Sequence, residues 1–141
     1  NLHQGAVGIG IDIGSGQIVC AVQRNRIITQ HPDTGVVFGE LKIPHWQQIL
    51  DLAASCANMT GLDYLGADVV IDRIRGPMLL ELNARPGLAI QVANQAGLRH
   101  RLATADKIAN LTNDQDEKIK LAREQFSQTR VGRGQLALEI V

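Results

Sequence analysis

The fold is decided by one dense stretch, which reads Leu65-Gly-Ala-Asp-Val-Val-Ile-Asp-Arg-Ile-Arg-Gly-Pro-Met-Leu-Leu-Glu-Leu-Asn83. Apolar, mostly branched residues lie on both sides of a short charged segment that ends in Gly76. This pattern predicts two antiparallel strands joined by a tight turn. If residues 73–76 form the turn, Asp72 lies opposite Pro77 and Asp68 lies opposite Glu81.

That register predicts a cluster of three oxygen-bearing side chains. Because side chains alternate between the faces of a strand, Glu81 and Asn83 share the face that carries Asp68, while Leu80 and Leu82 point into a core. Opposed residues lie about 4.5–5.5 Å apart at Cβ, where two carboxylates need a proton or a cation between them. Carboxylate and amide oxygens suit Mg²⁺. The alternative is that the acids are exposed edge-strand charges and that Asn83 opens a turn.

The rest of the chain predicts an α+β fold, with an antiparallel sheet flanked by helices. Short branched runs separated by turn formers predict three strands at residues 6–13, 17–23 and 25–30. An apolar stripe at helical spacing predicts a helix from Pro44, at the first helical position, to about Thr60, with Gly61 as its C-cap. Further helices are predicted at 89–96, 99–110 and 115–128, before a terminal strand or docked tail at 130–141.

The composition is that of one globular domain of 141 residues, with 45% hydrophobic and 20% charged residues. The formal net charge is zero and aromatic residues are only 3%, which argues against nucleic-acid and membrane-surface partners. Cys20 and Cys56 lie in apolar stretches, and two cysteines do not form a disulfide framework, so both are expected to be buried. No signal peptide or membrane-length apolar run is found, and a cytoplasmic location is expected.

Two motifs carry a family resemblance. Gly66-Ala-Asp68, followed by Gly76-Pro-Met-Leu-Leu-Glu-Leu-Asn-Ala-Arg-Pro-Gly87, closely resembles the last core motif of the ATP-grasp carboxylate–amine ligases. The opening Asn1-Leu-His-Gln-Gly-Ala is similar to the Asn-Leu-His-Arg-Gly-Gly loop of the alpha-L-glutamate ligase-like branch. The resemblance implies that residues 1–98 form the C-terminal part of a grasp domain. Residues 99–141 would be a helical extension and tail packed on it.

The resemblance also implies roles for the hairpin residues. In the family, the acid on the first strand and the Glu-x-Asn pair hold magnesium with the phosphates of ATP, and these positions match Asp68, Glu81 and Asn83. An arginine at the position of Arg85 steadies the transferring phosphate or acyl phosphate in several of these enzymes. The implied activity is ATP-dependent ligation of a carboxylate to an amine, from an amino acid or a peptide, through an acyl phosphate.

The opening loop is implied to bind the carboxylate substrate through His3, Gln4 and Gly5. Gln4 stands where the related ligases often have arginine, which leaves the nature of the anionic substrate open. In the family the ATP-clamping lysines and the adenine hinge precede this region, so we expect a preceding segment and an inactive isolated fragment. The alternative is a non-catalytic remnant or module that binds a nucleotide or a partner.

A rival motif lies at residues 11–16, which read Ile-Asp-Ile-Gly-Ser-Gly. It resembles the first phosphate loop of actin-like ATPases, a fold that needs a far longer chain. A glycine-rich turn between two strands is the preferred interpretation.

Overall fold

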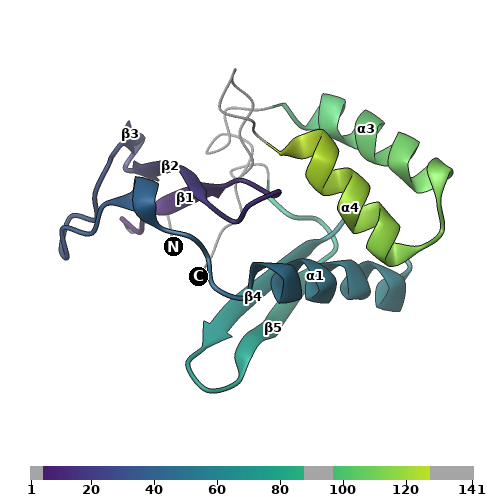
Figure 1. Cartoon of the computed structure of the whole chain (residues 1–141), viewed down its shortest axis with the longest axis horizontal. Helices are drawn as coiled ribbons and strands as arrows, with labels where there is room; N and C mark the ends of the chain where they lie inside the picture. Colours follow the sequence, from purple (N-terminus) through teal and green to yellow (C-terminus); the bar gives the residue numbers. More distant parts are fainter. Residues whose placement is uncertain (1–4, 88–96, 128–141) are drawn as a thin grey trace.

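The computed structural model describes residues 5–87 and 97–127, and it has the predicted α+β fold (Figure 1). The strands form two small antiparallel sheets, in the orders β1-β2-β3 and β4-β5. The elements are β1 (Gly8–Ile11), β2 (Ile18–Gln23), β3 (Arg26–Ile27), the 3₁₀-helix η2 (Phe38–Glu40), α1 (Trp46–Thr60), β4 (Gly66–Asp72), β5 (Gly76–Asn83), α3 (Leu98–Leu111) and α4 (Gln115–Phe126). The helix predicted at 89–96 and the tail predicted at 130–141 lie outside the described residues.

The first sheet has shorter strands than the sequence predicted. The strand predicted at 25–30 is regular only over Arg26–Ile27. The β2–β3 turn lies at Arg24 and Asn25, whose φ angles are +48° and +63°. Positive φ at both central residues defines a type I′ turn, whose twist matches that of a two-residue hairpin.

Helix α1 begins two residues later than predicted. Pro44 lies outside the helix, because His45 takes the left-handed conformation with φ +57° immediately before Trp46. The C-terminal prediction is confirmed: Gly61 has φ +67°, and its N–H donates to the carbonyl of Ala57 at 2.9 Å. Glycine adopts this conformation without a steric penalty, so it ends the helix cleanly.

Two apolar clusters form the core. Ile11, Trp46 and Ile49 join the first sheet to α1, and Val69 and Ile71 of β4 pack against them. The second cluster contains Ile18, Ala21 and Phe38. The prediction of buried cysteines is confirmed for Cys56, whereas Cys20 is only half-buried.

The β4–β5 hairpin differs from the predicted register at its turn. Asp72 pairs with Gly76 rather than Pro77, so the connection is one residue shorter than expected. Gly76 has φ +76°, which favours glycine at the end of such a connection. The Asp72 carboxylate caps the turn by accepting the N–H groups of Ile74 at 2.9 Å and Arg75 at 2.8 Å.

A β-bulge compensates for this one-residue difference. Between the Val69–Leu79 pair and the Asp68–Glu81 pair, Leu80 is an extra residue on β5. The predicted pairing of Asp68 with Glu81 is therefore confirmed. The prediction that Leu80 points into the core is wrong, because the bulge leaves it 62% exposed. Leu82 is half-buried.

Helix α3 packs on α4, and α4 packs on α1 and contacts the turn after β1 (Figure 1). Gln115 contacts α1, where its side chain bonds to those of Asn58 and Ser55. Arg101 of α3 lies over the ring of Phe126, with its guanidinium carbon 5.4 Å from the centroid. Within residues 5–87 and 97–127, no helix combines the length and apolar character needed to cross a membrane.

Candidate functional site

The predicted oxygen cluster lies on one face of the β4–β5 hairpin. Asp68 pairs directly with Glu81, and Asn83 pairs with Gly66 two residues farther along the same face. The opposite face of β4 packs on the core through Val69 and Ile71. The three oxygen-bearing side chains therefore share the face that points away from that core. Asp68 is half-buried, and Glu81 and Asn83 are exposed.

The donor set at this face fits a hard divalent cation. Two opposed carboxylates repel each other unless a positive group lies between them. No such group from the described residues takes this place, since neither acid forms a side-chain hydrogen bond or ion pair there. No group of three or more His, Cys, Asp or Glu side chains able to hold a metal occurs in residues 5–87 and 97–127. A cation at this face would therefore need the Asn83 amide as its third protein ligand, with water or phosphate oxygens completing the shell.

The local structure orients Asn83 and the loop that follows. The Asn83 Oδ1 atom accepts the Arg85 N–H at 3.1 Å, and an amide oxygen keeps a second lone pair for a cation. The alternative interpretation, in which Asn83 opens a turn, agrees with this hydrogen bond, whereas metal binding by Asn83 stays a prediction. Pro86 packs against Gly66, where an added Cβ would meet the Pro86 Cβ at 3.0 Å. This contact fixes the loop that carries Arg85 at the end of the site, where Arg85 is exposed.

The predicted substrate loop is only partly described. His3 and Gln4 lie outside the described residues, and Gly5 is the first one placed. Gly5 has φ +96°, and its carbonyl accepts the side-chain N–H of Gln23 at 2.8 Å. Gly5 is therefore joined to the first sheet beside the β2–β3 turn.

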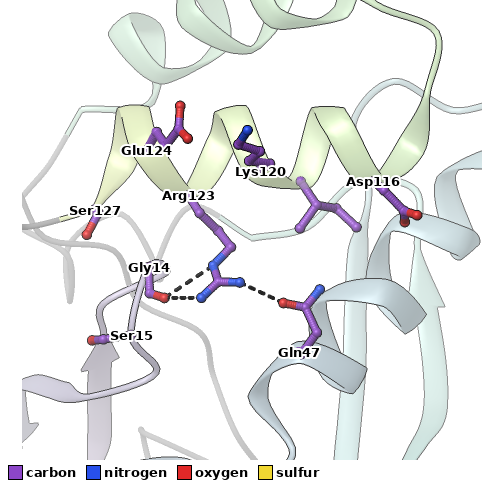
Figure 2. A pocket seen from close by; sticks show the side chains of 9 residues that line it. Gly14, Ser15, Gln47, Asp116, Lys120, Arg123, Glu124 and Ser127 are labelled. Carbon is purple, nitrogen blue, oxygen red and sulfur yellow. Dashed lines mark hydrogen bonds between the residues drawn. The ribbon is translucent and has the colours of Figure 1, made fainter.

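Sequence reasoning missed a hollow of about 500 Å³ between α4 and the turn after β1 (Figure 2). The Arg123 guanidinium points from α4 into it and donates twice to the Gly14 carbonyl, from Nε at 3.2 Å and from Nη2. Its Nη1 donates to Gln47 Oε1 of α1 at 2.7 Å. All these Arg123 hydrogen bonds go to protein groups. The hollow therefore lies where α4 contacts the turn after β1 and helix α1. No sequence pattern links positions this far apart.

Comparison with known proteins defines the class. A hairpin with paired acids and a Glu-x-Asn strand is the expected core motif of an ATP-grasp domain. A family model described as sugar-transfer associated ATP-grasp matches residues 1–107, and the chain belongs to this family. The predicted ATP-grasp membership is confirmed, but the match is not to the alpha-L-glutamate ligase-like branch. No curated protein and no solved structure gives a significant match.

The family gives the activity in general terms. ATP-grasp proteins are generally ATP-dependent ligases, and their domains typically bind ATP and Mg²⁺. Membership therefore suggests ligase-type or related chemistry that uses ATP. The donor set of Asp68, Glu81 and Asn83 is compatible with that class.

Proposed function

We propose that this chain is part of an ATP-dependent carboxylate–amine ligase and contributes its magnesium site and carboxylate-binding loop. The observation that carries the proposal is the direct pairing of Asp68 with Glu81, with Asn83 on the same hairpin face. This face is turned away from the core and combines two carboxylates with one amide. Such an arrangement opposes like charges, so it is suited to a site that binds a cation.

The proposed reaction has two steps. A substrate carboxylate oxygen attacks the γ-phosphorus of ATP, the bond to the bridging oxygen breaks, and ADP leaves. The nitrogen of an amine then attacks the acyl carbon of the acyl phosphate, inorganic phosphate leaves, and the amine loses a proton. The product is an amide, and no side-chain nucleophile is required.

The residues of this chain bind and orient the reactants. Asp68, Glu81 and Asn83 would hold Mg²⁺, which neutralises phosphate charge and supplies Lewis acidity when bound. Arg85 stands two residues beyond Asn83 on the fixed loop and would stabilise the charge on the transferring phosphoryl group. The opening loop, with His3, Gln4 and Gly5, would face the substrate carboxylate.

The candidate substrates come from the resemblance of the motifs and from the family match. The motifs resemble those of ligases that join amino acids or peptides, whereas the matched family is described as associated with sugar transfer. We therefore include both kinds of amine and acid among the candidates: amino acids and peptides, and amino sugars and sugar acids.

The test uses the intact protein that carries this chain, incubated with ATP, Mg²⁺ and pairs drawn from those candidates. Release of ADP that needs both the acid and the amine is the expected result. With the carboxylate labelled by ¹⁸O, one labelled oxygen should appear in the released phosphate, because the acyl phosphate transfers it on cleavage. Mass spectrometry of the product and of phosphate measures both.

Two outcomes would contradict the proposal. Unlabelled phosphate alongside amide formation would exclude the acyl phosphate route. Failure of every acid and amine pair to stimulate ADP release would favour a module that binds a nucleotide or partner without turnover.

A further inference from the structure

We propose that a second hollow, beside the segment that leads into α1, binds the phosphate group of a small phosphomonoester. This basic hollow has a volume of about 500 Å³, and Lys42, His45 and Arg123 are among the residues that line it. No residue of the β4–β5 hairpin lines it, so it is separate from the candidate metal site. The inference goes beyond the proposed function and does not depend on it.

The first observation is the charge of the lining. Lys42 and Arg123 carry positive charges, His45 can add a third, and no acidic residue is among the described residues that line the hollow. None of these three side chains forms an ion pair within residues 5–87 and 97–127. In the neighbouring hollow, by contrast, two acidic residues offset two basic ones. Because a concave surface of one charge sign concentrates ions of the other sign, the basic hollow attracts anions.

The second observation is that the walls are fixed without a ligand. Trp46 is 6% exposed, and its indole N–H donates to the Ile13 carbonyl at 2.8 Å. The backbone of Lys42 forms an antiparallel bridge with Gln17, which ties the segment before α1 to the first sheet. A site whose walls are already ordered loses less conformational entropy when a ligand binds.

The third observation is the donor capacity of Arg123. Its guanidinium donates from Nε and Nη2 to the Gly14 carbonyl and from Nη1 to Gln47 Oε1 (Figure 2). These bonds use three of the five N–H groups of an arginine, so one remains on each Nη atom. The bonds also hold the guanidinium in place, so its two remaining donors are positioned for the oxygens of a phosphate.

The number of basic groups favours a phosphomonoester over a carboxylate. A phosphomonoester carries about −1.5 to −2 charges near pH 7, whereas one carboxylate carries a single charge. Small-molecule sites have volumes of about 300–1,000 Å³, and this hollow falls within that range. It therefore leaves room for the organic group to which the phosphate is attached.

The test measures binding of inorganic phosphate to the intact protein by calorimetry, at constant ionic strength and without ATP or Mg²⁺. We expect saturable binding, together with a shift of the Trp46 indole N–H resonance, because this ring lines the hollow. Lys42→Gln should raise the Kd by about fivefold or more, through loss of a charged contact. The matched control is Lys120→Gln, which removes a lysine from the neighbouring hollow and should change the Kd by less than about twofold.

A second variant separates binding from folding. His45 has φ +57°, and asparagine adopts this conformation readily. The His45 side chain does not cap α1, so His45→Asn should melt at the wild-type temperature or above while phosphate binding weakens. Unchanged phosphate binding in both Lys42→Gln and His45→Asn would overturn the proposal. Equal loss in Lys42→Gln and Lys120→Gln, or no saturable binding to the wild type, would overturn it too.

Competition experiments distinguish two sources of the phosphate group. AMP and glucose 6-phosphate are each titrated against bound phosphate, with adenosine and glucose as their uncharged counterparts. Displacement by AMP alone would identify a nucleotide, and displacement by glucose 6-phosphate alone would identify a phosphorylated sugar; displacement by both would support a site that reads the phosphate itself. If neither displaces phosphate, or if adenosine or glucose does so equally well, the hollow is not a phosphomonoester site. The ligation assay tests the proposed function separately, so either conclusion can fail alone.

Discussion

The turn after β1 and the β4–β5 hairpin both carry acidic side chains, but they treat them in opposite ways. Asp12 in the turn is 5% exposed and accepts the Ser15 N–H at 2.7 Å and the Ser15 hydroxyl at 2.6 Å. In the hairpin, Asp68 and Glu81 lie directly opposite each other, with no such donors among the described residues. The chain satisfies the first acid itself, whereas no donor from the described residues reaches the second pair.

The difference follows from the cost of each arrangement. A buried carboxylate without hydrogen bonds is strongly unfavourable, so the burial of Asp12 requires the Ser15 donors. Opposed carboxylates on a partly exposed face cost less, and the protein can tolerate them where a ligand removes the repulsion. An acid with local donors is therefore accounted for by the fold, whereas an opposed pair without such donors is a candidate for cation binding.

The largest expected effect is on activity in Glu81→Gln. The change keeps the size of the side chain and one oxygen, but removes the charge that would hold magnesium. We expect turnover in the ATP-dependent ligation assay to fall by about two orders of magnitude or more, because phosphoryl transfer loses its cation. Stability without metal should stay level or rise, because one of two crowded carboxylates becomes neutral.

The matched control is Asp72→Asn, which removes one charge from the same hairpin but keeps an oxygen that caps the turn. It should retain turnover. If Glu81→Gln instead melts at a lower temperature and retains turnover, Glu81 is structural and the contrast between the two regions fails.

Asp12→Ala tests the other side of the comparison. It removes a buried acceptor and leaves the Ser15 N–H without its partner, so the free energy of unfolding should fall by about 2–3 kcal/mol. Chemical denaturation measures this loss. Turnover of the folded protein in the ATP-dependent ligation assay should be unchanged, and a normal stability with lost turnover would place Asp12 in a functional site.

Arg123→Gln should have a smaller effect on the same turn. The guanidinium joins α4 to the Gly14 carbonyl and to Gln47, so its loss should cost about 1–2 kcal/mol. Amide hydrogen exchange should increase in α4 more than in the β4–β5 hairpin. Lys120→Gln, which alters another cation lining the same hollow, should leave exchange near the wild-type rate. Equal effects of both variants would refute the role of Arg123 as a connection.

The hairpin shows how far local sequence reasoning reaches. The alternation of side chains and the glycine-ended turn were enough to predict that Asp68 pairs with Glu81, and Gly61 was enough to predict the end of α1. The bulge at Leu80 was not predictable, because a leucine in an apolar run has the same pattern whether it pairs or bulges. The predicted turn is one residue too long, and the bulge shifts the register back by one residue. The Asp68–Glu81 pair is therefore correct although the register nearer the turn is wrong.

The contacts of α4 could not be predicted for a different reason. Arg123 and Gly14 are separated by 109 residues, and a hydrogen bond to a backbone carbonyl places no requirement on the residue that provides it. The position of the Arg24 side chain beside Gly5 likewise depends on how the β2–β3 turn packs against the residue that precedes the first strand. Local periodicity predicts elements and neighbouring pairs, whereas such contacts depend on the packed structure.

The smallest expected effect concerns the pH dependence of the hairpin turn. The N–H groups of Arg75 and Ile74, in that order of importance, lower the pKa of the exposed Asp72 carboxyl. Because the folded pKa lies below the ordinary value of about 4, this group stabilises the folded state above that value and loses its contribution as pH falls through the folded pKa. Thermal melts of the wild type from pH 5 downward should therefore show a component that is absent in Asp72→Asn, whose side chain caps the turn but does not titrate. If the plots of Tm against pH are parallel for the two proteins, the turn contributes no acid sensitivity. The pKa of the Asp72 carboxyl would then be the same in the folded hairpin as in the unfolded chain.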